Sequence, residues 1–254
     1  MQPMFENKVI PYLGKLTNYT IKSKVLRITG IGESDVADLI SDILENQTNP
    51  TVAPYAKQGE TTLRITAKAH SEEKALSLIS PVEEKVREIL GDNIYGSGET
   101  SLEEVIANTL IKRNLTIATA ESCTGGLLAG KLINFPGISS IFLEGAITYS
   151  NESKINRLNV KKETLEKYTA VSKEVALEMA KGIAKSSGTN IGISTTGVAG
   201  PGGGAYDKPI GLVYIGLYIN GKTFVKELNY SGNRQFIRNI TVTRALDFLR
   251  RNLK

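Results

Sequence analysis

The sequence has few of the residues on which many known site types depend. Its 254 residues include one cysteine, Cys123, and one histidine, His70. A single cysteine excludes an internal disulfide and fits a reducing compartment. No segment approaches the ~20 apolar residues of a membrane-spanning helix, and the opening residues lack a secretory signal pattern. We therefore expect a soluble, cytoplasmic protein with no membrane partner.

The scarcity of histidine and cysteine also limits the chemistry. Because His70 lies in the first half of the chain, residues 100–254 cannot hold a Ser-His-Asp or Cys-His arrangement, or a metal cluster that contains histidine. We expect no metal and no cofactor. Cys123 could serve as a nucleophile only beside a helix N-terminus or a lysine, and a packed thiol is the simpler interpretation.

Charge is distributed unevenly along the chain. Residues 1–100 contain 11 Lys and Arg against 14 Asp and Glu, a net −3, and residues 101–254 contain 20 against 12, a net +8. The basic second half suits an anionic partner, either a nucleic acid or a small molecule. The acidic first half argues against a nucleic-acid role there.

The first hundred residues predict a connecting arm or short helix, residues 1–20, followed by a small α+β domain, residues 21–95. The stretch Gly91–Gly98 is rich in Gly, Asn and Ser and is the predicted linker. The predicted elements follow the order β-α-β-β-α: strand 22–29, helix 35–46, strands 51–57 and 61–69, and helix 71–90.

Residues 100–254 predict a larger domain, a three-layer α/β/α sandwich with a mixed sheet. Asn220-Gly221 between two β-rich runs indicates a tight hairpin, so the sheet must include an antiparallel pair. The predicted helices are 101–113, 124–134, 151–158, 172–186 and 233–251, and the predicted strands are 115–120, 142–149, 190–195, 210–219 and 222–230.

Two glycine-containing loops follow predicted strands. In Glu121–Gly126, Ser122 or Thr124 can cap the next helix, and Gly125 and Gly126 would let an anion approach free backbone N–H groups. The run Thr195–Gly204 can wrap donors around a ligand in the same way. The alternatives are an ordinary cap with close helix packing and a plain surface loop. Open α/β sheets bind ligands at such strand ends.

Lys154 is a candidate base. It falls in the first turn of the predicted helix after Tyr149, where the macrodipole disfavours a cation and lowers the pKa. A partly neutral lysine can take a proton from a serine hydroxyl, and Ser122, Ser139 and Ser140 are the candidate partners. The alternative is a solvated lysine. Arg234, near the start of the closing helix, suits a phosphate or carboxylate, or is solvated.

These segments together resemble the C-terminal domain of the CinA family of competence/damage-inducible proteins, a nicotinamide-nucleotide amidase. The resemblance implies metal-free hydrolysis of nicotinamide mononucleotide to nicotinate mononucleotide and ammonia, in pyridine nucleotide salvage. It implies Ser139 as nucleophile, or Ser140 after a one-residue slip, with Lys154 as its base and Tyr149 as a proton relay or orienting group. The matching segments are 120–126, 136–140, 148–154, 196–201 with 208–209, and 231–234.

The same resemblance assigns the remaining site residues and the partners. Thr196 and Arg234 would bind or polarise the substrate. A homodimer and a small nucleotide partner are implied. The alternative function is a catalytically silent module that binds a nucleotide or a competence or recombination partner. The residues expected to surround the nucleotide are Glu121, Ser122, Thr124, Gly125, Gly126, Gly197 and Gly200.

Residues 21–95 resemble the KH-type middle region of longer CinA proteins. Those proteins begin with a molybdopterin-binding-like domain linked to ADP-ribose pyrophosphatase activity. These 254 residues do not include that domain, so we expect no such activity. A KH region suggests RNA, but this one is net acidic and lacks a clear Gly-x-x-Gly clamp with basic neighbours. We expect a spacer or dimerisation element that does not bind nucleic acid.

Overall fold

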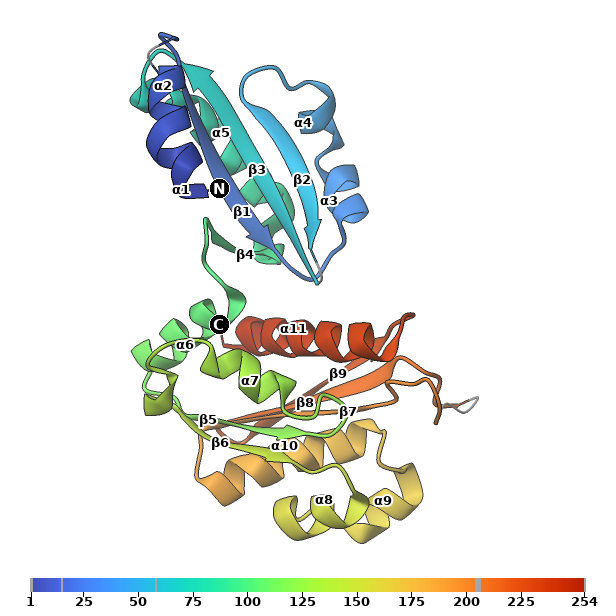
Figure 1. The fold of residues 1–254 in the computed structure, drawn as a ribbon. Coiled ribbons are helices and arrows are strands. Elements are labelled where there is room, and N and C mark those ends of the chain that lie inside the picture. The colour runs from blue at the N-terminus through green and yellow to red at the C-terminus, as the bar shows by residue number, and fades with distance from the viewer. Residues whose placement is uncertain (1, 15, 58, 204–206, 254) are drawn as a thin grey trace. The chain divides into compact units, whose positions relative to one another are not determined.

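The computed structural model describes residues 2–14, 16–57, 59–203 and 207–253. The chain divides into two compact units, Met1–Thr100 and Ser101–Lys254 (Figure 1). Each unit has its own sheet and its own helices, so each is described by itself.

The first unit is a four-stranded antiparallel sheet in the order β2-β3-β1-β4, with helices α3, α4 and α5 packed on one face (Figure 1). Leu26, Val52, Leu63 and Ile65 alternate along the strands and pack with apolar helix residues in one core. The strands are β1 Thr20–Ile28, β2 Thr51–Lys57, β3 Glu60–Ala69 and β4 Ile94–Ser97, and the helices are α1 Gln2–Met4, the π-helix Phe5–Val9, α2 Ile10–Gly14, α3 Glu33–Leu39, α4 Ser41–Glu45, α5 Glu72–Leu90 and the 3-10 turn Gly91–Asn93.

Two predictions for this unit were wrong. The predicted linker 91–98 contains β4, which pairs with β1. Tyr95 explains why: its ring is buried, and its hydroxyl donates a 2.7 Å hydrogen bond to Glu60. The predicted helix 35–46 is two helices, because the backbone leaves the helical region at Ile40. Composition rich in glycine and asparagine therefore did not exclude a strand.

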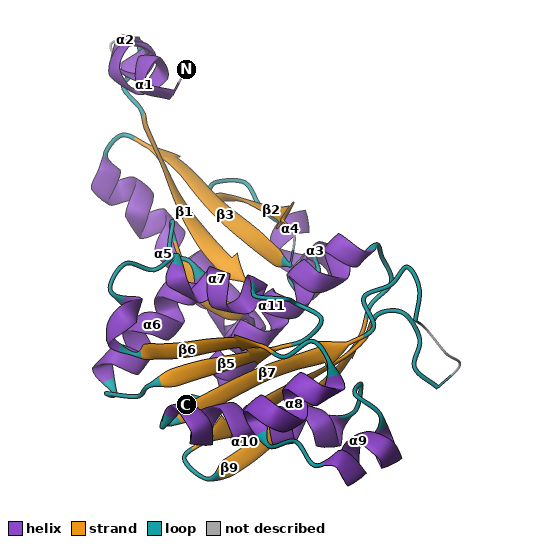
Figure 2. Cartoon of the chain, turned by 60° about the horizontal axis from the view of Figure 1, so that its bottom comes forward, coloured by secondary structure: helices purple, strands orange, loops and turns teal. Residues whose placement is uncertain are grey.

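The second unit confirms the predicted three-layer α/β/α sandwich with a mixed sheet. The sheet order is β6-β5-β7-β8-β9; β5 runs parallel to β6 and β7, and the β8-β9 hairpin turns at Asn220-Gly221. Helices α6, α7 and α11 cover one face, and α8, α9 and α10 cover the other (Figures 1 and 2). Helix α9 was not predicted.

The elements of this unit have the following bounds. The strands are β5 Ile117–Glu121, β6 Phe142–Ile147, β7 Ile191–Gly197, β8 Leu212–Ile219 and β9 Lys222–Asn229. The helices are α6 Leu102–Lys112, α7 Leu127–Ile133, the 3-10 turn Ile138–Ser140, α8 Asn151–Leu158, α9 Lys162–Tyr168, α10 Lys173–Ser187 and α11 Arg234–Asn252.

Glycine allows α10 to lie directly on the sheet. A Cβ atom added at Gly192 would stand 2.0 Å from the carbonyl oxygen of Ala180, and one added at Gly216 would stand 2.1 Å from that of Ala176. No side chain fits at either distance, so the helix backbone packs against β7 and β8 only because these two positions are bare.

The parallel strands bring three chain segments to one edge of the sheet (Figure 2). Glu121 pairs with Ile147 at the ends of β5 and β6, and the N–H of Thr148 donates to the carbonyl of Glu121 at 2.8 Å. The N–H of Ser122 donates to the carbonyl of Thr195 in β7 at 2.9 Å. The residues just after β5 and β6 therefore lie beside β7 at the edge where α/β sheets bind ligands.

Candidate functional site

Lys154 is a fully buried lysine at this edge. Ser150 caps α8 by accepting a 3.0 Å hydrogen bond from the N–H of Ser153, which fixes the turn that carries Lys154. Lys154 Nζ lies 2.8 Å from the carbonyl oxygen of Thr148, 3.1 Å from that of Tyr149 and 3.2 Å from Ser122 Oγ. Among the described residues, no carboxylate forms an ion pair with it.

These surroundings shift the Lys154 amine toward its neutral form. Burial lowers the pKa of Lys154 from 10.5 to about 8, and nearby Cys123 opposes this lowering only in part. Desolvation is the main cause of the lowered pKa, and not the helix macrodipole from which it was predicted. A neutral amine has two N–H groups and one lone pair. Because the two carbonyls can only accept, the N–H groups point at them and the lone pair is left for the hydroxyl of Ser122.

The structure pairs Lys154 with Ser122 rather than with Ser139. Ser139 is exposed in the 3-10 turn before β6, whereas Lys154 comes after the far end of that strand. The six residues of β6 span about 20 Å. Within the described residues, no hydrogen bond joins Ser139 or Ser140 to Lys154, and Ser140 Oγ donates to the carbonyl of Gly137 at 3.0 Å. The geometry therefore favours Ser122, and not Ser139, as the hydroxyl partner of Lys154.

Glu121 shapes the loop that carries Ser122. Its buried carboxylate accepts hydrogen bonds from the N–H groups of Gly126, Leu128 and Ala129 at 2.9, 3.0 and 2.8 Å. A carboxylate at a helix N-terminus satisfies donors that would otherwise lack partners. Glu121 thus stabilises the start of α7, and neither Ser122 nor Thr124 caps that helix as predicted.

The turn between Ser122 and α7 depends on two glycines. Gly125 and Gly126 adopt φ values of +59° and +94°, a region that side chains other than glycine rarely occupy. Thr124 is buried and shares a 2.6 Å hydroxyl–hydroxyl hydrogen bond with Thr195 of β7. These contacts hold the Ser122 loop rigidly against the sheet.

Of the remaining predicted residues, Thr196 and Gly197 make contacts inside the domain, whereas Arg234 is exposed. Thr196 is buried and donates to the carbonyl of Ala170 at 2.7 Å, which ties β7 to the segment after α9. Gly197 serves packing, because a Cβ atom there would stand 2.7 Å from the carbonyl oxygen of Leu212. Arg234 donates to the carbonyl of Gly200 at 2.9 Å and to the hydroxyl of Tyr149 at 3.4 Å.

Arg234 and Tyr149 are both exposed, so they present a cation and a hydroxyl at the surface. Arg238, one helical turn after Arg234 in α11, was not predicted as a site residue. Its guanidinium donates to the carbonyls of Cys123 and Thr124 at 3.2 and 2.8 Å. The i,i+4 spacing of two arginines on the closing helix was the available signal.

Cys123 is unsuited to nucleophilic chemistry. It is buried, and its desolvation raises the pKa of the thiol to about 12. A nucleophilic cysteine must be a thiolate near neutral pH. The thiol is therefore protonated and packed, in agreement with the simpler of its two interpretations.

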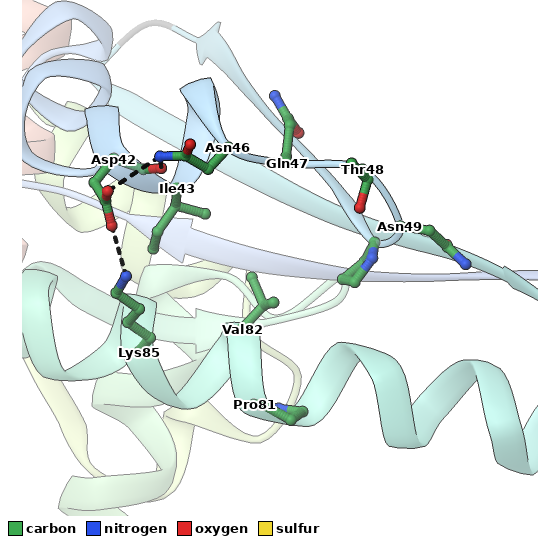
Figure 3. Close-up of a pocket in the computed structure, with 10 residues that line it drawn as sticks. Asp42, Ile43, Asn46, Gln47, Thr48, Asn49, Pro81, Val82 and Lys85 are labelled. Atoms are coloured by element: carbon green, nitrogen blue, oxygen red, sulfur yellow. Dashed lines mark hydrogen bonds and ion pairs between the residues drawn. The ribbon is translucent and has the colours of Figure 1, made fainter.

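Other features of the described residues add no chemistry to this site. Within them, no group of three or more His, Cys, Asp or Glu side chains is arranged to hold a metal ion, and no helix has the length and apolar character for a membrane span. A hollow of about 380 Å³ lies in the first unit, between α4 and α5 (Figure 3). Its Asp42 pairs with Lys85 at 2.8 Å and accepts from Asn46, so these three polar groups satisfy one another.

The fold and the site define a class: an α/β/α domain with a buried lysine and a serine hydroxyl at the carboxyl ends of its parallel strands. Residues 99–253 match the CinA C-terminal domain, and residues 23–96 match the KH domain of the damage-inducible protein CinA. The chain belongs to the CinA family.

Similar proteins support the same family. A competence-damage inducible protein of Clostridium botulinum (ATCC 19397) is 92% identical over the whole chain, and one of Clostridium acetobutylicum is 64% identical over 99% of it. The chain spans 62% and 61% of their lengths. The crystal structure of a competence/damage inducible protein from Agrobacterium tumefaciens is 41% identical, with a TM-score of 0.58 over 59% of this chain and 92% of that one.

Proposed function

We propose that the second unit hydrolyses the carboxamide of nicotinamide mononucleotide, releasing nicotinate mononucleotide and ammonia, with Ser122 as nucleophile and Lys154 as its base. The observation that carries the proposal is the buried Lys154 amine, without a carboxylate partner in the described residues, 3.2 Å from Ser122 Oγ. A binding module has no need for such a pair, because an unpaired buried lysine costs stability. Amide hydrolysis needs a nucleophile with an adjacent base.

The first half of the reaction forms an ester. Ser122 Oγ attacks the carbonyl carbon of the carboxamide while Lys154 Nζ accepts the hydroxyl proton. Lys154 then returns that proton to the amide nitrogen, the C–N bond breaks and ammonia leaves. The N–H of Gly125, which has no hydrogen-bond partner within the described residues, is the proposed donor to the developing oxyanion.

The second half restores the enzyme. Water attacks the ester carbon as Lys154 accepts a proton from it, and the bond to Ser122 Oγ breaks as that proton passes to the serine. Arg234, exposed at the start of α11 and already close to Tyr149, is the proposed partner of the 5′-phosphate. Its planar fork can hold two phosphate oxygens at once.

Ammonia release tests the proposal directly. The purified chain is expected to release ammonia from nicotinamide mononucleotide at the same rate with and without EDTA, and much more slowly from nicotinamide riboside, which lacks the phosphate. Folding is checked by circular dichroism. A folded protein that releases no ammonia would overturn the amidase proposal and favour a module that binds a nucleotide or a protein partner.

The rate is expected to depend on pH through Lys154. The amine accepts a proton only when neutral, and its pKa is about 8. The value of kcat/KM should therefore rise about tenfold per pH unit below pH 7 and level off above pH 8.5. A thiolate mechanism through Cys123 would keep rising toward pH 12. A profile flat from pH 6 to 9 would exclude Lys154 as the base.

A further inference from the structure

Helices α3, α4 and α5 pack on one face of the sheet of the first unit, and no residue of the π-helix or α2 is buried against the other face. Antiparallel register puts Val25 beside Arg64, Ser23 beside Thr66, and Ile21 beside Lys68 on this other face. The opposite face carries Leu26, Leu63 and Ile65 and is buried by α3, α4 and α5. We call the surface that carries Val25 and Arg64 the open face. Its residues are Ile21, Ser23, Val25, Arg27, Thr51, Ala53, Tyr55, Lys57, Glu60, Thr62, Arg64, Thr66 and Lys68.

Charge within this unit is separated by face. On the helix side, Lys22 pairs with Glu72 at 2.8 Å and Lys24 with Glu83 at 2.6 Å. On the open face, Arg27 is paired with Glu60. Arg64 and Lys68 are exposed, and no carboxylate in the described part of the chain forms an ion pair with either. The open face is therefore basic, although residues 1–100 are net acidic.

Aromatic rings accompany these cations. Tyr55 is 49% exposed, and the Arg64 guanidinium carbon lies 5.6 Å from its ring centroid. Tyr19 is 45% exposed, with Lys68 Nζ 4.2 Å from its centroid and the His70 ring stacked at 4.5 Å. Tyr19 and Lys68 also line a hollow of about 430 Å³ over β1, β2 and β3. Exposed rings beside exposed cations on one face suit a ligand that combines planar rings with negative charge.

We propose that the open face binds single-stranded nucleic acid. Arg64 and Lys68 lie about 13 Å apart along β3, so they can contact different phosphates of one strand. Proteins that bind single strands combine such cations with exposed rings on which nucleobases stack. An acidic peptide would complement the cations but would not need the rings. The expected absence of nucleic-acid binding rested on the net acidic charge and on the lack of a Gly-x-x-Gly clamp; the open face is basic and would bind a strand without that clamp.

Fluorescence anisotropy with a labelled 12-nucleotide oligodeoxythymidylate at 50 mM salt tests the proposal. The full chain is expected to bind, with Arg64→Glu and Lys68→Glu each weakening the affinity about tenfold and Tyr55→Leu about tenfold through lost stacking. The matched control is Lys74→Glu on α5, an exposed position that gives the same change in net charge. It should change the affinity less than twofold.

Four results would overturn the proposal. The first is no binding at 50 mM salt by the folded parent. The second is equal weakening by Lys74→Glu and Arg64→Glu, which would indicate attraction by net charge only. The third is equal affinity for an abasic deoxyribose-phosphate oligomer, which would exclude a role for the nucleobases. The fourth is tighter binding of an acidic peptide of equal charge. All variants are at exposed positions, and circular dichroism confirms that they fold.

Discussion

Replacing Ser122 or Lys154 by alanine is expected to lower kcat for ammonia release at least about 10³-fold. Ser122→Ala removes the atom that attacks the carboxamide. Lys154→Ala removes the amine 3.2 Å from that atom and leaves the serine as an ordinary weak nucleophile. The measurement is single-turnover ammonia release from nicotinamide mononucleotide by each purified variant.

The double variant distinguishes a catalytic pair from two independent residues. Groups that act as one unit lose most of their effect when either is removed, so Ser122→Ala with Lys154→Ala should be no slower than the slower single variant. Ser139→Ala is the matched control. Because the Ser139 hydroxyl is exposed and not bonded to Lys154 within the described residues, the activity of this variant should stay within about threefold of the parent. Loss of activity in Ser139→Ala, with full activity in Ser122→Ala, would identify Ser139 as the nucleophile.

Local sequence patterns predicted much of the second unit. Alternation and turn residues gave the strands on either side of Asn220-Gly221 and the helix that carries Lys154, because each of these features depends on neighbours in the chain. The lowered pKa of Lys154 was also predicted, although from the helix macrodipole. In the structure the larger cause is burial, which depends on the residues that fold over the side chain.

The identity of the serine could not be predicted from spacing. Ser139 is closer to Lys154 along the chain. The partner in space is set by the parallel pairing of Glu121 with Ile147, and sequence spacing does not reveal the register between these two strands. The role of Glu121 could not be predicted for the same reason, because the local sequence is the same whether its carboxylate caps α7 or faces a ligand. In the first unit, β4 became evident only through the contacts of Tyr95 with distant residues.

The stability of the parent relative to a Lys154→Met variant is expected to rise with pH. The pKa of Lys154 is about 8 in the folded protein and 10.5 in a solvated lysine, so between these values the unfolded chain binds more protons than the folded one. The free energy of unfolding therefore increases with pH through this window, and the cost of burying the charge is fully present below pH 8. At about 1.4 kcal/mol per pH unit, the change is on the order of 3 kcal/mol.

Comparing parent and variant at two pH values isolates this effect. Methionine leaves the carbonyls of Thr148 and Tyr149 without their donor, but that loss is the same at pH 7.5 and pH 10.5 and cancels in the difference. Urea unfolding of both proteins at both pH values gives the free energies of unfolding that are compared. The control is Lys74→Met, at an exposed lysine, which should show no such change with pH. A difference below about 0.5 kcal/mol would mean that Lys154 stays charged when folded, and a charged amine could not take the proton of Ser122.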